Sequence, residues 1–195
     1  KNISERPFES DDRSEFGHWE GDLIVGKRGG GHECLLTLAE RKGRFYYSVK
    51  IPDKQMSSVI EALDKLESKL GHENFKKIFK SITFDNGTEF RDFIGLETSI
   101  NKIDKRTEVY YANPYHSWER GTNERCNRMM RKYFPKGTDF SKVSDKDIHI
   151  ALCKINHTVR KKLNYETAMD QIKKLENSIS TIFEKFNMIN CFIAN

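Results

Sequence analysis

Hydrophobic and polar residues alternate in three short stretches near the start of the chain. The first covers residues 19–25 and contains Asp22, and two more follow over residues 34–39 and 44–51. Alternation with a period of two is typical of strands that bury one face. Because only short segments separate the three stretches, the pattern predicts an antiparallel meander.

The two segments between these strands contain glycine. Residues 27–32 include three consecutive glycines, and residues 41–43 end in Gly43. Glycine supplies the positive φ angles that tight hairpin turns need. A phosphate-binding loop is the alternative for residues 27–32, but such a loop needs spaced glycines, a lysine and a following helix. The segment lacks this pattern, so hairpin turns are favoured.

A helical spacing of apolar residues begins after the third strand. Apolar side chains recur from Met56 to Leu70, which predicts an amphipathic helix over residues 54–70 with Asp53 as its cap. The other predicted elements are strands over 81–84 and 107–111 and helices over 89–96, 118–133, 144–163 and 165–195. This order predicts an α/β fold, with a mixed five-stranded sheet flanked by helices.

Composition sets limits on the class of protein. The 195 residues fit one domain with an ample core, and 13 Phe and 7 Tyr argue against disorder. The net charge of +5 permits a nucleic-acid partner without requiring one. No Cys-x-x-Cys pair indicates a zinc site, and no apolar run approaches the ~20 residues that span a bilayer. We therefore expect no membrane partner, and no feature indicates a small-molecule substrate.

Three acidic positions lie where a sheet could bring them together. Asp22 is within the first strand, Asp85 ends the fourth, and Glu119 or Glu124 opens the helix after the fifth. Clustered carboxylates suit Mg²⁺, and two such ions ~4 Å apart can promote phosphodiester cleavage. Each acid also has an ordinary interpretation, Asp85 as a turn residue and Glu124 as a solvated helix position. Asp22 is the hardest to explain in this way, because a charge within an apolar strand costs free energy unless it is paired.

The predicted helix over residues 118–133 is strongly basic. Its candidate DNA-binding residues are Arg120, Arg125, Asn127, Arg128, Arg131 and Lys132, and Arg160, Lys161 and Lys162 extend the basic surface. Cations that neutralise DNA phosphates make binding dependent on salt. Tyr115, His116 and Trp118 are expected in the loop that leads into this helix, where a base or a strand end could be held. Trp118 has two open interpretations, as a stacking surface for a base or as a core anchor for the loop.

Four blocks of sequence resemble the catalytic blocks of IS-thirty family bacterial insertion-sequence transposases. They are residues 18–26, 83–90, 117–124 and 133–140, with Glu5, Arg6, Pro7 and Arg13 ahead of them. The resemblance implies an RNase H-like fold of the retroviral integrase type and a site of two aspartates and a glutamate. It further implies that two Mg²⁺ (or Mn²⁺) ions support DNA cleavage at element ends and transfer of the 3′-hydroxyl into target DNA. A bacterial cytoplasmic protein that assembles as a homodimer or larger complex is expected.

The resemblance leaves two candidates for the third acid. The family's customary assignment falls on Glu119, whereas the order of residues 121–128 resembles the opening of the integrase catalytic helix and selects Glu124. Residues five apart are about 140° apart on a helix, so both cannot face the metals from one regular helix. We favour Glu124, with Glu119 as a helix-start acid or a partner for Arg120.

The resemblance also predicts the division of the chain. Residues 1–17 are expected to form an extended arm, residues 18–163 the catalytic core, and residues 164–195 a divergent helical tail. Residues 158–162 and 165–168 lack the two prolines that the family typically carries there, so the match weakens toward the tail. Two alternatives therefore stay open: an RNase H-type nuclease without joining activity, and an inactive DNA-binding or assembly module from a decayed element. An N-terminal helix-turn-helix that recognises the element end is expected before Lys1.

Overall fold

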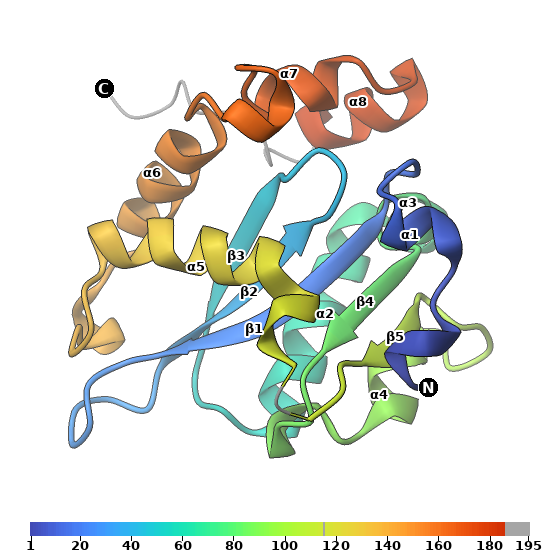
Figure 1. The fold of residues 1–195 in the computed structure, drawn as a ribbon. Coiled ribbons are helices and arrows are strands. Elements are labelled where there is room, and N and C mark those ends of the chain that lie inside the picture. Colours follow the sequence, from blue (N-terminus) through green and yellow to red (C-terminus); the bar gives the residue numbers. More distant parts are fainter. Residues whose placement is uncertain (115, 186–195) are drawn as a thin grey trace.

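The computed structural model describes residues 1–114 and 116–185, and Figure 1 shows a central sheet with helices on both faces. The strands are β1 (His18–Val25), β2 (Cys34–Glu40), β3 (Tyr46–Ile51), β4 (Ser81–Phe84) and β5 (Glu108–Tyr111), in the order β3-β2-β1-β4-β5. β1, β2 and β3 form the antiparallel meander, whereas β4 pairs parallel with both β1 and β5. The predicted mixed five-stranded sheet is confirmed.

Most of the predicted helices form. They are α2 (Met56–Leu70), α4 (Phe93–Glu97), α5 (Gly121–Tyr133), α6 (Asp145–Asn156), α7 (Ala168–Lys173) and α8 (Asn177–Lys185). The sequence pattern does not reveal α3 (His72–Ile78), which follows α2 directly because Gly71 adopts a φ of 81° between them. The last ten residues of the predicted C-terminal helix, 186–195, lie outside the described part of the chain.

Four of the predicted helices have wrong boundaries. The helix predicted over residues 89–96 is divided into a 3₁₀ helix, η2 (Thr88–Phe90), and α4, and the described part of the helix predicted over residues 165–195 is divided into α7 and α8. The sequence predicts that α6 reaches residue 163, but it ends at Asn156, whose side chain exchanges hydrogen bonds of 2.9 and 2.8 Å with the backbone of Tyr46. Beyond it, a backbone bridge between Arg160 and Glu166 encloses a short 3₁₀ helix, η5 (Lys161–Leu163). The helix expected from residue 118 is likewise divided into a 3₁₀ helix, η3 (Ser117–Arg120), and α5.

The N-terminal 17 residues pack against the sheet and are partly helical, where the sequence predicts an extended arm. They contain a 3₁₀ helix, η1 (Ile3–Glu5), and one turn of α-helix, α1 (Phe8–Asp11). Asn2 and Glu5 form a capping box, which explains the first turn. A bridge between Asn2 and Tyr111 then holds the segment beside β5. The predicted boundaries at residues 17 and 163 stay predictions.

Each face of the sheet has its own hydrophobic core. On one face, Trp19, Leu36 and Leu38 pack with apolar residues of α2, α3 and α8. On the other, apolar side chains of β1 and β2 pack against α5 and α6, with Cys126 and Met130 buried at the centre. This second core fixes α5 across the sheet (Figure 1) and therefore fixes what the polar side chains of α5 can reach.

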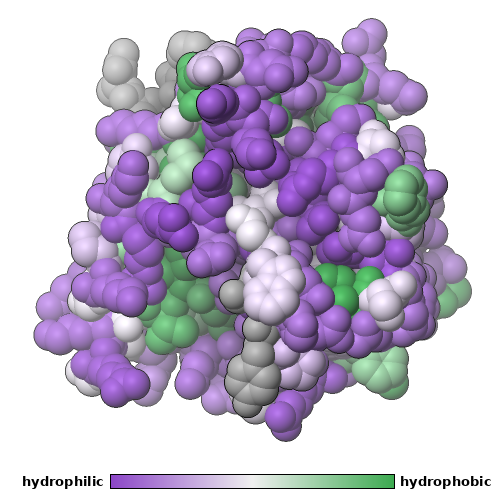
Figure 2. Space-filling model, in the orientation of Figure 1, coloured by the Kyte–Doolittle hydropathy of each residue, from purple (hydrophilic) through white to green (hydrophobic). Residues whose placement is uncertain are grey.

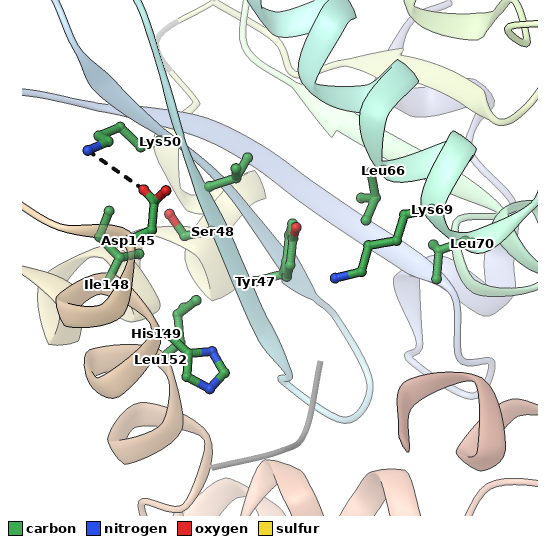
Figure 3. Close-up of a pocket in the computed structure, with 11 residues that line it drawn as sticks. Tyr47, Ser48, Lys50, Leu66, Lys69, Leu70, Asp145, Ile148, His149 and Leu152 are labelled. Atoms are coloured by element: carbon green, nitrogen blue, oxygen red, sulfur yellow. Dashed lines mark ion pairs between the residues drawn. The ribbon is translucent and has the colours of Figure 1, made fainter. Parts of the chain in front are cut away.

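A cavity of about 260 Å³ lies beside the edge strand β3, between α2 and α6 (Figure 3). Tyr47 and Leu66 line it, and an ion pair of 3.6 Å joins Lys50 to Asp145 at one end. The described residues that line it include none of the candidate site residues. No helix within residues 1–114 and 116–185 is long and apolar enough to cross a membrane.

Candidate active site

The structure brings Asp22 and Asp85 to a single guanidinium group. β1 and β4 are parallel neighbours, so Asp22 on β1 and Asp85, just after β4, approach the same part of the sheet. Arg120 donates a hydrogen bond of 2.9 Å from Nη2 to Oδ2 of Asp85, and its Nη1 lies 3.9 Å from Oδ1 of Asp22. The two carboxylates therefore already share one cation.

Gly21 permits the close approach of β4 at this point. A Cβ atom on Gly21 would collide with the ring of Phe84, so the position has no room for a larger residue. The backbone carbonyl of Gly21 also accepts a hydrogen bond of 3.1 Å from Arg120. The residue before Asp22 thus lets Phe84 pack under β1, next to Asp85, and contributes to holding Arg120.

Asp22 is oriented by its neighbours. Its Oδ2 accepts a hydrogen bond of 2.9 Å from the Asn127 side chain, whose Oδ1 in turn accepts one of 2.7 Å from the Tyr46 hydroxyl. Burial raises the pKa of Asp22, although the nearby Arg120 guanidinium opposes this shift. Hydrogen bonds therefore hold the Asp22 carboxylate in one orientation, and a nearby cation stabilises its charged form.

A buried network anchors the first turn of α5 to β1. Glu20, which is fully buried, accepts a hydrogen bond of 2.8 Å from the backbone N–H of Asn123 and forms an ion pair with Arg41. The Asn123 side chain returns a bond of 2.7 Å to the carbonyl of Glu20. A carboxylate at a helix N-terminus is favoured by the helix dipole. Sequence reasoning missed this network, although Glu20 and Asp22, two residues apart on one strand, share a face.

The two candidate glutamates have different surroundings. Glu119 lies in η3, and its two carboxylate oxygens accept hydrogen bonds of 2.8 and 3.0 Å from the backbone and side chain of Asn113. Glu124 lies in the first turn of α5, three residues before Asn127, and its exposed carboxylate is 3.6 Å from Arg128. Residues three apart lie on one side of a helix, so Glu124 shares the side that meets Asp22. The pairing of Glu119 with Arg120 is not seen among the described residues, because Arg120 turns to the aspartates.

The donor set fits a divalent cation in part. Carboxylate oxygens are the ligands that Mg²⁺ prefers, and the shared guanidinium shows that positive charge is stabilised between Asp22 and Asp85. Among the residues that the structure describes, no cluster of three or more acidic, histidine or cysteine side chains is close enough to hold a metal. The structure thus brings together two of the predicted ligands, and Glu124 is not with them.

The predicted DNA-binding residues have four different surroundings. Arg120 and Asn127 bind the aspartates, while Arg131 donates a hydrogen bond of 2.8 Å to the carbonyl of Val25. Arg128 is exposed beside Glu124. The last two, Arg125 and Lys132, line a separate cavity of about 290 Å³.

Trp118 is not a core anchor. Its side chain is 69% exposed, and its ring contacts His116 with the ring centroids 4.5 Å apart. Tyr115, which sequence reasoning places in the same loop, lies outside the described residues. The exposed indole is thus free of the core and belongs to η3, the same segment that carries Arg120.

The fold is that of a retroviral integrase catalytic core. It matches a chain of the cryoEM structure of the simian T-cell lymphotropic virus intasome in complex with the PP2A regulatory subunit B56 gamma. The match covers 82% of this chain and 55% of that chain, with a TM-score of 0.61 and 19% sequence identity. It also matches the catalytic core domain of BIV integrase over 80% of this chain and 93% of that one, with a TM-score of 0.53 and 14% identity. These matches confirm the predicted RNase H-like fold.

The chain is homologous to the IS-thirty (IS30) family of insertion-sequence transposases. It is 35% identical to the transposase of IS4351 from Bacteroides fragilis, over 93% of this chain and 52% of that protein. It is 32% identical to the transposase InsI of IS30A from Escherichia coli, over 88% of this chain and 42% of that protein. The chain therefore spans about half the length of these relatives, or less. No family model matches it.

Proposed function

We propose that this chain is the catalytic domain of a DNA transposase, which hydrolyses one strand at an element end and transfers the resulting 3′-hydroxyl to target DNA. The observation that carries the proposal is the convergence of Asp22 and Asp85, from separate strands, on one cationic group. Homology to insertion-sequence transposases supports the same reaction class.

In this proposal, Asp22 and Asp85 hold divalent metal ions, Mg²⁺ or Mn²⁺. Two bound ions would activate the attacking hydroxyl and stabilise the leaving oxygen of the phosphodiester. The protein contributes the orientation of the ligands. Asn127, held by Tyr46, fixes one oxygen of Asp22, and the backbone N–H of Leu23 binds the other at 2.9 Å. Arg120 balances the charge of both carboxylates, and Asp22 and Asp85 are the residues that would hold a metal in its place.

We assign the third ligand to Glu124. Glu119 already uses both carboxylate oxygens on Asn113, so recruiting it would release the backbone N–H of that residue. Glu124 is exposed, shares the side of α5 that carries Asn127, and has only the weak surface pairing with Arg128 to lose. Departure of Arg120 from between the aspartates would clear the space that Glu124 must enter.

The proposed partners are the DNA of the element ends and of the target. Two element ends must be brought together for transfer, so a homodimer or larger assembly is expected, in the bacterial cytoplasm. The similarity of this chain to a chain of a viral intasome supports the expectation of an assembly.

The test is a nicking and joining assay on a supercoiled plasmid and a labelled oligonucleotide duplex, with Mg²⁺ or Mn²⁺ and with EDTA as control. Metal-dependent nicks together with labelled joined products are expected. Nicks without joined products would favour the RNase H-type nuclease. DNA binding without any cleavage, in either metal, would favour the inactive module.

A further inference from the structure

A second concentration of positive charge lies in a cavity on another side of α5. The cavity, of about 290 Å³, is formed by α5, the β2–β3 turn and the segment that follows α6. Six of its lining residues are cationic: Arg44, Arg125, Lys132, Arg160, Lys161 and Lys162. The described residues that line it include no acidic side chain, and they include neither Asp22 nor Asp85. This cavity is therefore a different place from the aspartate pair.

Arg160 is a buried residue of this cavity, and hydrogen bonds hold its side chain in place. The residue is only 9% exposed, and two of its guanidinium nitrogens donate to the backbone carbonyls of Arg44 and Ile155. Its Nε is buried and has no hydrogen-bond partner among the described residues. A buried, unpaired donor of a cationic group costs free energy, which an anionic acceptor would recover.

The cations of the cavity repel one another. Burial lowers the pKa of Arg44, and the charges of Arg160 and Arg125 add to this shift, whereas the side chain of Cys126 opposes it. Burial and the charge of Arg125 also lower the pKa of Arg160, again opposed by the side chain of Cys126. Within residues 1–114 and 116–185, no ion pair joins any of the six cations to a carboxylate. A folded chain tolerates such a cluster at a cost, and a bound anion removes that cost.

Exposed lysines and arginines continue outward from the buried arginine. Lys132, Lys161 and Lys162 are exposed around the cavity, and the exposed Arg128 lies between Arg125 and Lys132 on α5. The face of the molecule that α5 crosses is largely hydrophilic (Figure 2). An extended row of cations matches the repeated phosphates of a nucleic-acid backbone better than it matches a single small anion.

We propose that this cavity binds the phosphate backbone of a DNA segment, separately from the strand that reaches Asp22 and Asp85. The inference rests on the proposed action of this chain on DNA. Arg160 and Arg44 receive one phosphate at the bottom of the cavity, and Lys161, Lys162 and Lys132 bind its neighbours. Contacts of this kind position a duplex without reading its sequence.

The test compares two variants that remove the same charge from exposed lysine pairs. Lys161→Gln/Lys162→Gln alters the cavity, and Lys76→Gln/Lys77→Gln alters α3, whose core residues pack on the opposite face of the sheet. Binding to a fluorescent duplex is measured by anisotropy at several salt concentrations, with EDTA present. The cavity variant should lose about two units of the slope of log K against log [salt], and bind about tenfold or more weakly at low salt. The control variant should match the unmodified chain.

The outcomes separate the inference from the proposed function. If the unmodified chain binds DNA and both variants show its slope, the cavity does not bind the backbone and the inference is wrong. If the unmodified chain binds no DNA at all, the proposed function fails first. Thermal unfolding of both variants checks that each is folded, which the exposed positions of all four lysines lead us to expect.

Discussion

Arg120 and Arg160 show what the same side chain does in two different surroundings near α5. Arg120 meets two carboxylates, those of Asp22 and Asp85. Arg160 meets backbone carbonyls and other cations, and one of its buried nitrogens has no partner among the described residues. Around Arg120, carboxylates of the protein itself balance the positive charge. Around Arg160, we propose that an anion from outside the protein supplies the balancing charge.

This difference shows why a count of basic residues says little about where an anion binds. Sequence reasoning treats the arginines of residues 120–131 as one DNA-binding surface, yet Arg120 serves the acidic site. The surface available for phosphates lies where carboxylates are missing. Substitutions at the aspartate pair beside Arg120 should therefore affect cleavage, whereas substitutions at the cavity around Arg160 should affect DNA binding.

The largest effect is expected for Asp22→Asn. The substitution keeps the size of the side chain but removes the charge that attracts a metal. Metal-dependent nicking should fall by about a thousandfold or more, since bound metals contribute several kcal/mol to such reactions. Salt-sensitive DNA binding, measured in parallel by anisotropy, should stay within about twofold. Full nicking activity in this variant would overturn the assignment of the site.

Removal of the Glu20 side chain should destabilise the fold, which supports both the aspartate pair beside Arg120 and the cavity around Arg160. Glu20→Ala leaves Arg41 without its buried partner and frees the backbone N–H of Asn123. The free energy of unfolding should fall by about 3–5 kcal/mol, measured by urea denaturation. The control is Glu61→Ala, which breaks an exposed pair with Lys65 and should cost about 0.5 kcal/mol or less. Equal losses in the two variants would contradict the anchoring role.

Glu124→Gln and Glu119→Gln should separate catalysis from stability. Loss of a metal-binding carboxylate at Glu124 should reduce nicking by about a hundredfold, with little change in unfolding temperature because the side chain is exposed. Glu119→Gln should retain more of the nicking activity but lose about 1–2 kcal/mol of stability, because Asn113 loses a charged acceptor. The reverse pattern would assign Glu119 to the site.

The smallest effect is a change in the dependence of stability on pH in Arg120→Ala. Asp22 has a raised pKa in the folded state, so folding binds its proton more tightly and the free energy of unfolding falls as pH rises above the ordinary value of 3.8. Arg120 opposes that shift. Without it, the free energy of unfolding should fall further as pH rises above about 4, by up to about 1 kcal/mol more in metal-free buffer. Arg128→Ala, near Glu124, is the control and should show no change.

Much of the fold follows from local patterns in the sequence. Alternating stretches identify the meander, and the helical spacing from Met56 to Leu70 identifies α2 to within two residues. The early end of α6 could not be predicted, because it depends on bonds between Asn156 and Tyr46, which are 110 positions apart in the chain. Local patterns carry no information about such a contact.

The site was predictable to a lesser degree. Asp22 could be selected because a charge in an apolar strand is unusual, whereas Asp85 is selected through the resemblance, since by itself it has an ordinary interpretation as a turn residue. The structure brings the two together. The role of Arg120 could not be foreseen, since it depends on the path of η3 across the end of the sheet. The cavity around Arg160 depends on three distant segments, and its unpaired nitrogen is visible only in three dimensions.

The most direct test of the proposed site is the position of Mn²⁺ in crystals of this chain with bound DNA, located by anomalous scattering. We predict a peak between the carboxylates of Asp22 and Asp85, with Glu124 turned toward it and the Arg120 guanidinium displaced. A structure with DNA and Mn²⁺ present, but with Arg120 still bound to both aspartates and no peak between them, would contradict the central claim.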